Sequence, residues 1–308
     1  MQNERIKVLY IMGCGRSGST VLDTVLGNAT KVESVGELCN LGRAISSENE
    51  YCACGLLARN CQFWKEVSTQ WRQMAGTKYS FDQWVSLQRK VEQYRNIPNL
   101  FNPNYLNSEE FISYSAGLSA LFHSLAINTG KDVIVDSSKG PMRALAISKN
   151  KHLDLKVIHL VRDGRGVSWS LKKGNRKDPA AGVQREIRSK PIWRTALAWV
   201  RANLASEGVL TRIEAKDKIR IRYEDFIDNP IRQLVRIEAF SGVEMKAVID
   251  KLNSSQEFYV GHTIAGNRAR MAGRIKLEAD YSWHQNLTRG DRIIFGLIAG
   301  PLSRRYGY

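Results

Sequence analysis

A pattern of short apolar run, tight turn and helix occurs four times in this 308-residue chain and limits the folds open to it. Short apolar runs that end at glycine or at a polar residue are typical of buried strands. Helices between such strands make the strands parallel and cover both faces of the sheet. The sequence therefore predicts a three-layer α/β fold with a central parallel sheet flanked by helices. The expected strands are Ile6–Met12, Val133–Val135, Val157–Val161 and Ile219–Tyr223, and the expected helices include Ser19–Leu26, Pro141–Lys149 and one from Pro230 to about Gly242.

The rest of the chain is interpreted as part of the same unit. Residues 62–130 are aromatic-rich and polar, and we interpret them as a helical insertion over one end of the sheet. We find no internal repeat, low-complexity tract or linker, so residues 1–308 are expected to form a single domain. The apolar stretch 293–302 is shorter than the ~18 residues of a membrane span and is interpreted as a buried helix. The apolar run near the N-terminus is too short for a secretory signal, and we expect a cytoplasmic location.

The loop after the first strand is typical of a phosphate-binding site. It runs Gly13-Cys14-Gly15-Arg16-Ser17-Gly18-Ser19-Thr20. A glycine-rich loop that opens a helix presents backbone N–H groups to an anion. The loop fits the Walker A pattern at both its glycines and at Thr20, but Ser19 replaces the lysine that ATPases and kinases place on the β- and γ-phosphates. The nearest cation is Arg16.

A second candidate phosphate ligand pair follows the third expected strand. Arg162 stands directly at the carboxyl end of this strand, where open α/β sheets bind ligands. Ser170 follows eight residues later, about two helical turns along. A guanidinium and a hydroxyl placed in this way can bind a second phosphate together. A salt-bridged surface arginine and an unrelated serine are the alternative.

The net charge of +16 points to an anionic partner. Residues 162–222 hold 16 basic and 6 acidic residues, and residues 261–308 hold 8 and 3, so two segments carry almost all of the excess. An excess of basic residues of this size is compatible with a nucleotide, a nucleic acid, an acidic glycan or an anionic lipid as the partner. The apolar fraction of 43% excludes a mainly disordered chain.

The five cysteines leave three alternatives open. Cys52, Cys54 and Cys61 lie close together in the sequence, and Cys39 is a candidate fourth metal ligand. Their spacing matches no standard structural zinc pattern. A labile disulfide and fully reduced thiols are the other two interpretations.

The two phosphate motifs together resemble those of sulfotransferases that use 3′-phosphoadenosine 5′-phosphosulfate (PAPS). Residues 16–20 resemble the 5′-phosphosulfate loop of that family, and Arg162 with Ser170 resembles its 3′-phosphate motif. The segment Ile221-Arg222-Tyr223-Glu224-Asp225-Phe226 resembles the segment whose tyrosine lies against adenine. The tail from Gly261 onward and the Cys52–Trp64 segment resemble bacterial members. Arg16 stands where cytosolic small-phenol enzymes have lysine, and this resembles the carbohydrate and protein-tyrosine branches.

The resemblance implies a P-loop-like fold, a PAPS donor and a set of roles. Glu37 is expected to be the catalytic base, with His159 and His262 as competitors for this role. Arg16 is expected to hold the 5′-phosphosulfate and stabilise the leaving phosphate, and Lys139 to steady the sulfuryl group. No metal is expected in the reaction, because the sulfate of PAPS carries only one charge. Residues 62–130 are expected to cap the acceptor site, and 261–308 to close over the cofactor and acceptor. The expected ligands of PAPS are Gly15, Arg16, Ser17, Gly18, Ser19, Thr20, Arg162, Ser170, Tyr223, Arg268 and Arg270.

The expected activity is sulfuryl transfer to a hydroxyl or amine of a small-molecule, glycan or lipid-linked acceptor, with no nucleic-acid partner. Two alternatives remain at this stage: a P-loop kinase acting on a small molecule, and a non-catalytic binder of a polyanion. The surplus basic residues around 172–190 are not explained by a nucleotide. They are compatible with long-range steering of PAPS, with an acidic acceptor, or with peripheral contact to an anionic membrane surface.

Overall fold

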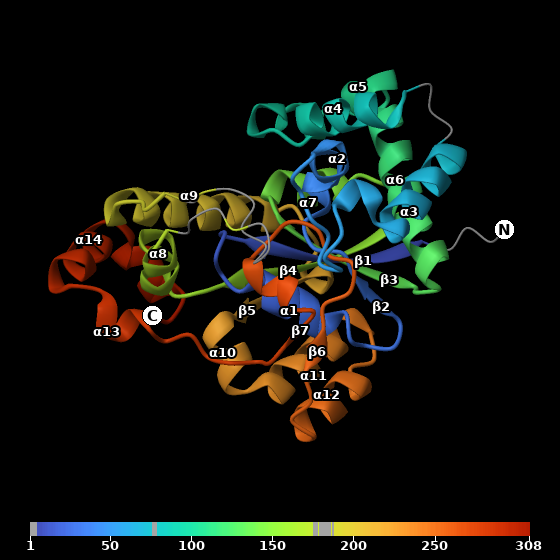
Figure 1. Cartoon of the computed structure of the whole chain (residues 1–308). Helices are drawn as coiled ribbons and strands as arrows, with labels where there is room; N and C mark the ends of the chain where they lie inside the picture. Colours follow the sequence, from blue (N-terminus) through green and yellow to red (C-terminus); the bar gives the residue numbers. More distant parts are fainter. Residues whose placement is uncertain (1–4, 76–78, 175–177, 179–185, 187) are drawn as a thin grey trace.

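A five-stranded parallel sheet forms the centre of the computed structural model (Figure 1), which describes residues 5–75, 79–174, 178, 186 and 188–308. The order of the strands is β2-β3-β1-β4-β5, and every neighbouring pair is parallel. This confirms the predicted α/β, P-loop-like architecture of a central sheet flanked by helices. The strands are β1 (Ile6–Gly13), β2 (Val32–Ser34), β3 (Val133–Lys139), β4 (Leu153–Val161) and β5 (Lys218–Arg222).

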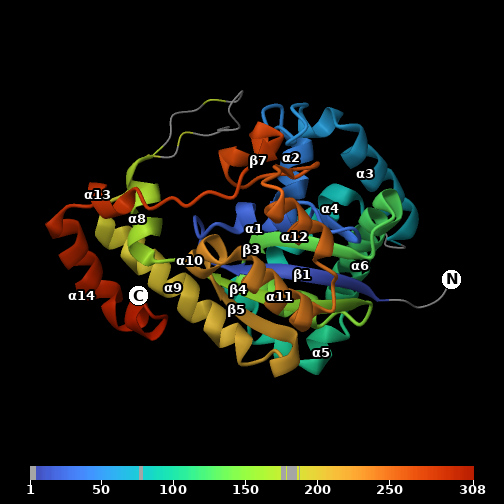
Figure 2. The ribbon, with the colours of Figure 1, turned by 90° about the horizontal axis from the view of Figure 1, so that it is seen from below.

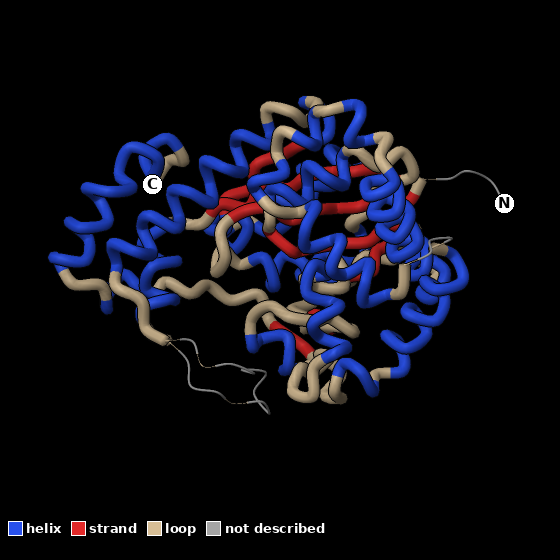
Figure 3. Tube along the Cα trace, turned by 90° about the horizontal axis from the view of Figure 1, so that it is seen from above, coloured by secondary structure: helices blue, strands red, loops and turns tan. Residues whose placement is uncertain are grey.

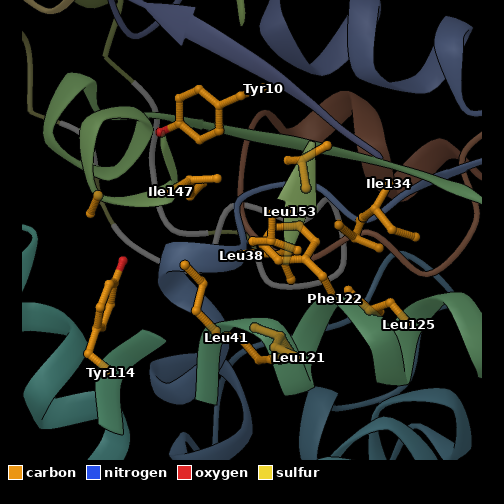
Figure 4. Packing of buried hydrophobic residues seen from close by; sticks show 14 of the residues in the cluster. Tyr10, Leu38, Leu41, Tyr114, Leu121, Phe122, Leu125, Ile134, Ile147 and Leu153 are labelled. Carbon is orange, nitrogen blue, oxygen red and sulfur yellow. The ribbon is translucent and has the colours of Figure 1, made fainter. Parts of the chain in front are cut away.

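Side chains of β1 alternate between the two faces of the sheet. Val8, Tyr10 and Met12 pack into one core, whereas Leu9 and Ile11 pack into another. Successive residues of a strand point to opposite faces, so a strand covered on both sides is apolar throughout. The first core, part of which is drawn in Figure 4, lies against α6 (Glu109–Thr129) and α7 (Pro141–Ser148). The second core is covered by α1 (Ser19–Leu26), α10 (Tyr223–Asp228), α11 (Pro230–Ser241) and α12 (Lys246–Asn253).

The described residues of 62–130 form helices and the segments that connect them (Figure 1). Trp64, Trp71 and Trp84 are each only 1% exposed, so these rings belong to the core and offer no stacking surface to a ligand. That this segment caps the acceptor site stays a prediction. The helices between β2 and β3 are α2 (Leu41–Ser46), α3 (Gln62–Met74), α4 (Phe81–Val91), α5 (Pro103–Leu106) and α6.

A third core lies at the carboxyl end of β4 and is surrounded by helices from the second half of the chain. Figure 3 shows the helices near the C-terminus gathered at one side of the sheet. Val161 at the end of β4 packs there with Trp199, Phe295 and Tyr306. The helices around it are α8 (Gly164–Lys172), α9 (Ile192–Leu210), α13 (Trp283–Asn286) and α14 (Arg289–Arg305). A short antiparallel pair, β6 (Phe258–Tyr259) and β7 (Arg274–Ile275), precedes α13 and α14, and an extended segment leads from β7 to α13 (Figure 2).

The structure corrects two expectations. Strand β2 was not predicted, because it has three residues, lies at the edge of the sheet and includes the polar Glu33. The stretch 293–302 is helical as predicted but buried on one face only, since Phe295 is 2% exposed whereas Ile293 is 61% and Leu297 is 80% exposed. No helix within the described ranges is long and apolar enough to cross a membrane.

Stability should depend on pH through Asp23, which is buried between α1 and β2 and accepts a hydrogen bond of 2.7 Å from Ser34 Oγ. Burial raises the pKa of this carboxyl to about 8. Between the unfolded pKa, about 3.9, and the folded one, the folded protein keeps a proton that the unfolded chain has lost. The free energy of unfolding should therefore fall by about 1.4 kcal/mol for each pH unit of rise in that window.

Asp23→Asn should remove this contribution, because an amide is neutral at every pH in the window. Chemical unfolding of wild type and variant between about pH 5 and about pH 7 measures the two slopes. Asp132→Asn, which changes an exposed carboxyl, is the matched control. Parallel profiles for wild type and Asp23→Asn would show that Asp23 is ionised in the folded protein.

Candidate functional site

The loop between β1 and α1 contains two residues with positive φ angles, a backbone conformation that few residues adopt. Gly18, directly before α1, has φ +88°, and a Cβ atom there would lie 2.3 Å from the ring of Tyr223. Arg16 has φ +70°, which is uncommon for a residue with a side chain. The loop therefore brings its backbone against Tyr223 and keeps the first amides of α1 accessible to an anion.

Gly18→Ala should be destabilising and should weaken anion binding, because the new Cβ meets Tyr223 and forces a strained φ. We expect a loss of about 1–3 kcal/mol in the free energy of unfolding. Gly15→Ala is the matched control, since its φ is not positive and a Cβ atom there would have no neighbour within 4 Å. Urea unfolding of both variants measures the difference, and equal losses would contradict the role assigned to Gly18.

Arg16 is the loop's cation and points toward α8. Its Nε donates to Ser170 Oγ at 3.0 Å, and its carbonyl accepts from Arg162 at 3.2 Å. Burial lowers the pKa of the Arg16 guanidinium, and the positive charges of Arg162 and Arg268 lower it further. The positive charges of these arginines repel one another, and an anion bound between them would offset this repulsion. The group therefore favours an anionic ligand.

Arg162 follows β4 directly and lies between the loop and the C-terminal segment. Its guanidinium is stacked on the ring of Tyr223, 4.5 Å from the ring centre. Its NH2 group donates to the Asp280 carbonyl at 3.0 Å and lies 3.6 Å from the Asp280 carboxylate. Only 7% of Arg162 is exposed, so these contacts fix the guanidinium at the end of the strand.

Glu37 and Lys139 form an ion pair on the other side of the loop. Lys139 ends β3, and Glu37 follows β2, the strand beside it. The second carboxylate oxygen of Glu37 accepts from Asn40 Nδ2 at 2.9 Å. The Glu37 amide donates to the Ile264 carbonyl at 3.0 Å. Both side chains are 17% exposed, so the carboxylate is oriented by these neighbours and still reachable.

These groups surround one cavity of about 340 Å³ at the carboxyl end of the sheet. Its chemistry is that of an anion site with one carboxylate–lysine pair beside it. Three predicted residues do not line the cavity: Ser17 and Arg270 are buried, and Arg268 is exposed. The predicted site residues that line it are Gly15, Arg16, Gly18, Ser19, Thr20, Glu37, Lys139, Arg162, Ser170 and Tyr223.

The sequence did not single out the individual residues of the C-terminal segment that line the cavity. Asn267 donates its amide to Thr20 Oγ1 at 3.1 Å, and Asp280 pairs with Arg162. Gly266 and Glu278 also line the cavity. The Gly266-Asn267 pair was a visible signal in the sequence, whereas nothing local distinguishes Glu278 or Asp280 from other surface acids.

The competing histidines lie elsewhere. His159 is fully buried in β4, with Nε2 3.3 Å from Asn203 Oδ1, and burial lowers its pKa to about 4. His262 does not line the cavity and faces the cysteines instead. Cys39, the candidate fourth ligand of those cysteines, lies apart from them, with its amide donating to Ser138 Oγ. Of the surplus basic residues, Arg176, Lys177 and Arg185 lie outside the described residues.

Comparison with known proteins places the chain in a family. The family model described as the sulfotransferase family matches residues 9–247. The chain belongs to this family, and it is therefore a transferase. No curated protein sequence matches it.

Solved structures similar to the chain are also described as sulfotransferases. The sulfotransferase domain of the Synechococcus PCC 7002 olefin synthase is 17% identical over 100% of this chain and 96% of that one, with a TM-score of 0.49. The sulfotransferase domain of the curacin biosynthetic pathway is 17% identical over 97% and 98%, with a TM-score of 0.48. Sulfotransferase STF1 of Mycobacterium tuberculosis H37Rv is 11% identical over 96% and 77%, with a TM-score of 0.46.

Proposed function

We propose that the protein transfers a sulfuryl group from PAPS to a hydroxyl or amine of an acceptor. The observation that carries this proposal is the cavity lining: Arg16, Arg162, Lys139 and Glu37 come from four separate parts of the chain and meet around one anion site. The membership of the sulfotransferase family supports the same activity.

Binding of the donor is assigned to the two phosphate motifs. Arg16 and the first amides of α1 hold the 5′-phosphosulfate, and Arg162 with Ser170 holds the 3′-phosphate. Tyr223, whose ring already lies against Gly18 and Arg162, contacts adenine. The donor set is cationic and rich in N–H groups, as a ligand with several phosphate and sulfate oxygens requires. Arg268 and Arg270 are not needed for this assignment.

The chemical step needs positioning, charge stabilisation and one base. The acceptor oxygen or nitrogen forms a bond to sulfur while the bond from sulfur to the 5′-phosphate oxygen breaks, and 3′,5′-adenosine bisphosphate (PAP) leaves. Glu37 takes the proton of the acceptor, a role in which a positioned carboxylate is effective. Arg16 stabilises the negative charge that develops on the leaving 5′-phosphate oxygen, and Lys139 holds the sulfuryl group in position. Arg16 acts through its charge and its N–H groups and not as a proton donor, since an arginine does not release its proton at ordinary pH.

The acceptor is proposed to be a small-molecule, glycan or lipid-linked hydroxyl, with the insertion 62–130 next to it. Ser19 at the position of the kinase lysine argues against an ATP-dependent kinase. A polyanion binder without activity would explain the charge but not the Glu37–Lys139 pair inside the cavity.

Thermal unfolding with nucleotides tests the donor. We expect PAP to raise the Tm strongly without a metal ion, because RT ln(1 + [L]/Kd) is about 2.7 kcal/mol at 100 times Kd. ATP should have a weak effect, with or without Mg²⁺. Equal stabilisation by PAP and by ATP with Mg²⁺ would favour the kinase alternative.

A further inference from the structure

Three cysteines and one histidine lie together outside the cavity. The group is Cys52, Cys54, Cys61 and His262, called here the cysteine–histidine cluster. Its four ligand atoms lie within 4.8 Å of one another, and it is the sole cluster of this kind that the described ranges contain. The three cysteines are free thiols. Cys52 and Cys61 are buried, whereas Cys54 is exposed, so the cluster is reachable from solvent.

The distances between these atoms resemble the edges of a metal tetrahedron. His262 Nδ1 lies 3.3 Å from Cys61 Sγ and 3.7 Å from Cys52 Sγ, and the Sγ atoms of Cys54 and Cys61 are 3.7 Å apart. With Zn–S bonds of about 2.3 Å and Zn–N bonds of about 2.0 Å, tetrahedral edges are about 3.8 Å between sulfurs and about 3.5 Å from sulfur to nitrogen. Three thiolates and an imidazole are soft ligands that favour zinc over magnesium or calcium.

The local backbone supports the ligands. Gly55, with φ +89°, closes a turn in which its amide donates to the Cys52 carbonyl at 3.0 Å. The backbone amides of Cys54 and Trp64 form hydrogen bonds with the thiols of Cys52 and Cys61. The His262 ring stacks on Phe63, with ring centres 4.8 Å apart and planes at 9°. Such outer contacts orient metal ligands.

The cluster joins two segments that meet beside Glu37. The amide of Ala53 donates to the Thr263 carbonyl at 3.0 Å, and Trp64 Nε1 donates to the His262 carbonyl at 3.0 Å. The next residue, Ile264, accepts from the Glu37 amide at 3.0 Å and donates to the Val35 carbonyl at 3.2 Å. A metal ion on His262 would therefore fix the segment that holds the backbone of Glu37.

We propose that Cys52, Cys54, Cys61 and His262 bind one structural zinc ion that ties the 262–267 segment to the segment 52–61. The three thiols release their protons to solvent as the ion binds. The ion stands apart from the cavity and takes no part in the transfer. The sequence pattern did not match a standard zinc motif because its fourth ligand lies 201 residues after the third.

Metal analysis of the full chain, purified without chelators and without a histidine tag, tests the proposal. We expect about one zinc ion per chain in the wild type. Cys54→Ser should lose it, and this change at an exposed position should leave the fold intact. Cys39→Ser and His152→Ala, which change a cysteine and a histidine outside the cluster, should keep the full zinc content. Equal zinc in the wild type and in Cys54→Ser, or a wild type without zinc, would overturn the proposal.

Cobalt provides a second measurement on the same protein. After zinc removal, added Co²⁺ should give the strong visible absorption of a tetrahedral thiolate site in the wild type and not in Cys54→Ser. A disulfide between Cys54 and Cys61, found by mass spectrometry in freshly purified wild type, would overturn the zinc site.

Amide exchange tests the structural role without relying on the proposed activity. Removal of zinc should accelerate exchange in peptides that contain Ala53, Glu37 and the 262–267 segment, because the hydrogen bonds between these segments lose their anchor. Peptides from β4 should not change. Unchanged exchange at Glu37 would show that the cluster does not support the site.

Discussion

Arg16→Ala should lower the rate of sulfuryl transfer by about 10²–10³ and weaken PAP binding. The guanidinium stands in the loop before α1, hydrogen-bonded to Ser170 and close to Arg162. Removal of one preorganised donor from a developing negative charge costs about 2.7–4 kcal/mol of transition-state stabilisation. Transfer of ³⁵S from labelled PAPS and calorimetric titration with PAP measure the two effects.

Arg16→Lys separates charge from geometry in this prediction. Lysine keeps the positive charge but loses the planar group that reaches Ser170 and a ligand oxygen at the same time, so activity should recover only in part. Arg95→Ala, which removes an exposed arginine outside the cavity, is the matched control and should change neither quantity. Wild-type affinity for PAP in Arg16→Ala would contradict the assignment of this loop.

Glu37→Gln should lower kcat by about 10²–10⁴ while it leaves PAP binding nearly unchanged. A positioned base contributes a factor of this size, and glutamine keeps the shape of the side chain but cannot take a proton at neutral pH. The residue is oriented by Lys139, Asn40 and the Ile264 carbonyl, so the amide should occupy the same place. Single-turnover transfer of ³⁵S separates the chemical step from binding.

Glu278→Gln is the matched control for Glu37→Gln, because Glu278 lines the same cavity and the change is chemically the same. It should retain most of the activity. Equal losses of activity in both variants would show that the activity depends on the net charge of the cavity rather than on one base. Wild-type activity in Glu37→Gln would show that another group accepts the proton.

Local sequence signals predicted the elements that carry the proposed donor site. The runs Ile6–Met12 and Val157–Val161 are apolar because their strands are covered on both faces, and each is followed by residues of the cavity, Arg16 and Arg162. The carboxyl ends of parallel strands meet at one edge of the sheet, so these residues could be brought together before their contacts were known.

Tertiary contacts between distant segments could not be predicted in this way. Asp280 reaches Arg162 and His262 reaches the cysteines across more than a hundred residues, and no periodicity marks either partner. Strand β2 was missed because three residues are too few for a pattern. The stretch 293–302 looked buried from composition, although α14 exposes Ile293 and Leu297.

The most direct test of the central claim is transfer of ³⁵S from labelled PAPS to fractions of a cell extract, without added Mg²⁺. We predict that wild type labels at least one acceptor and forms PAP in equal amount, and that Glu37→Gln does not. Failure of the wild type to label any fraction, together with metal-dependent transfer of the γ-phosphate of ATP, would contradict the proposed activity.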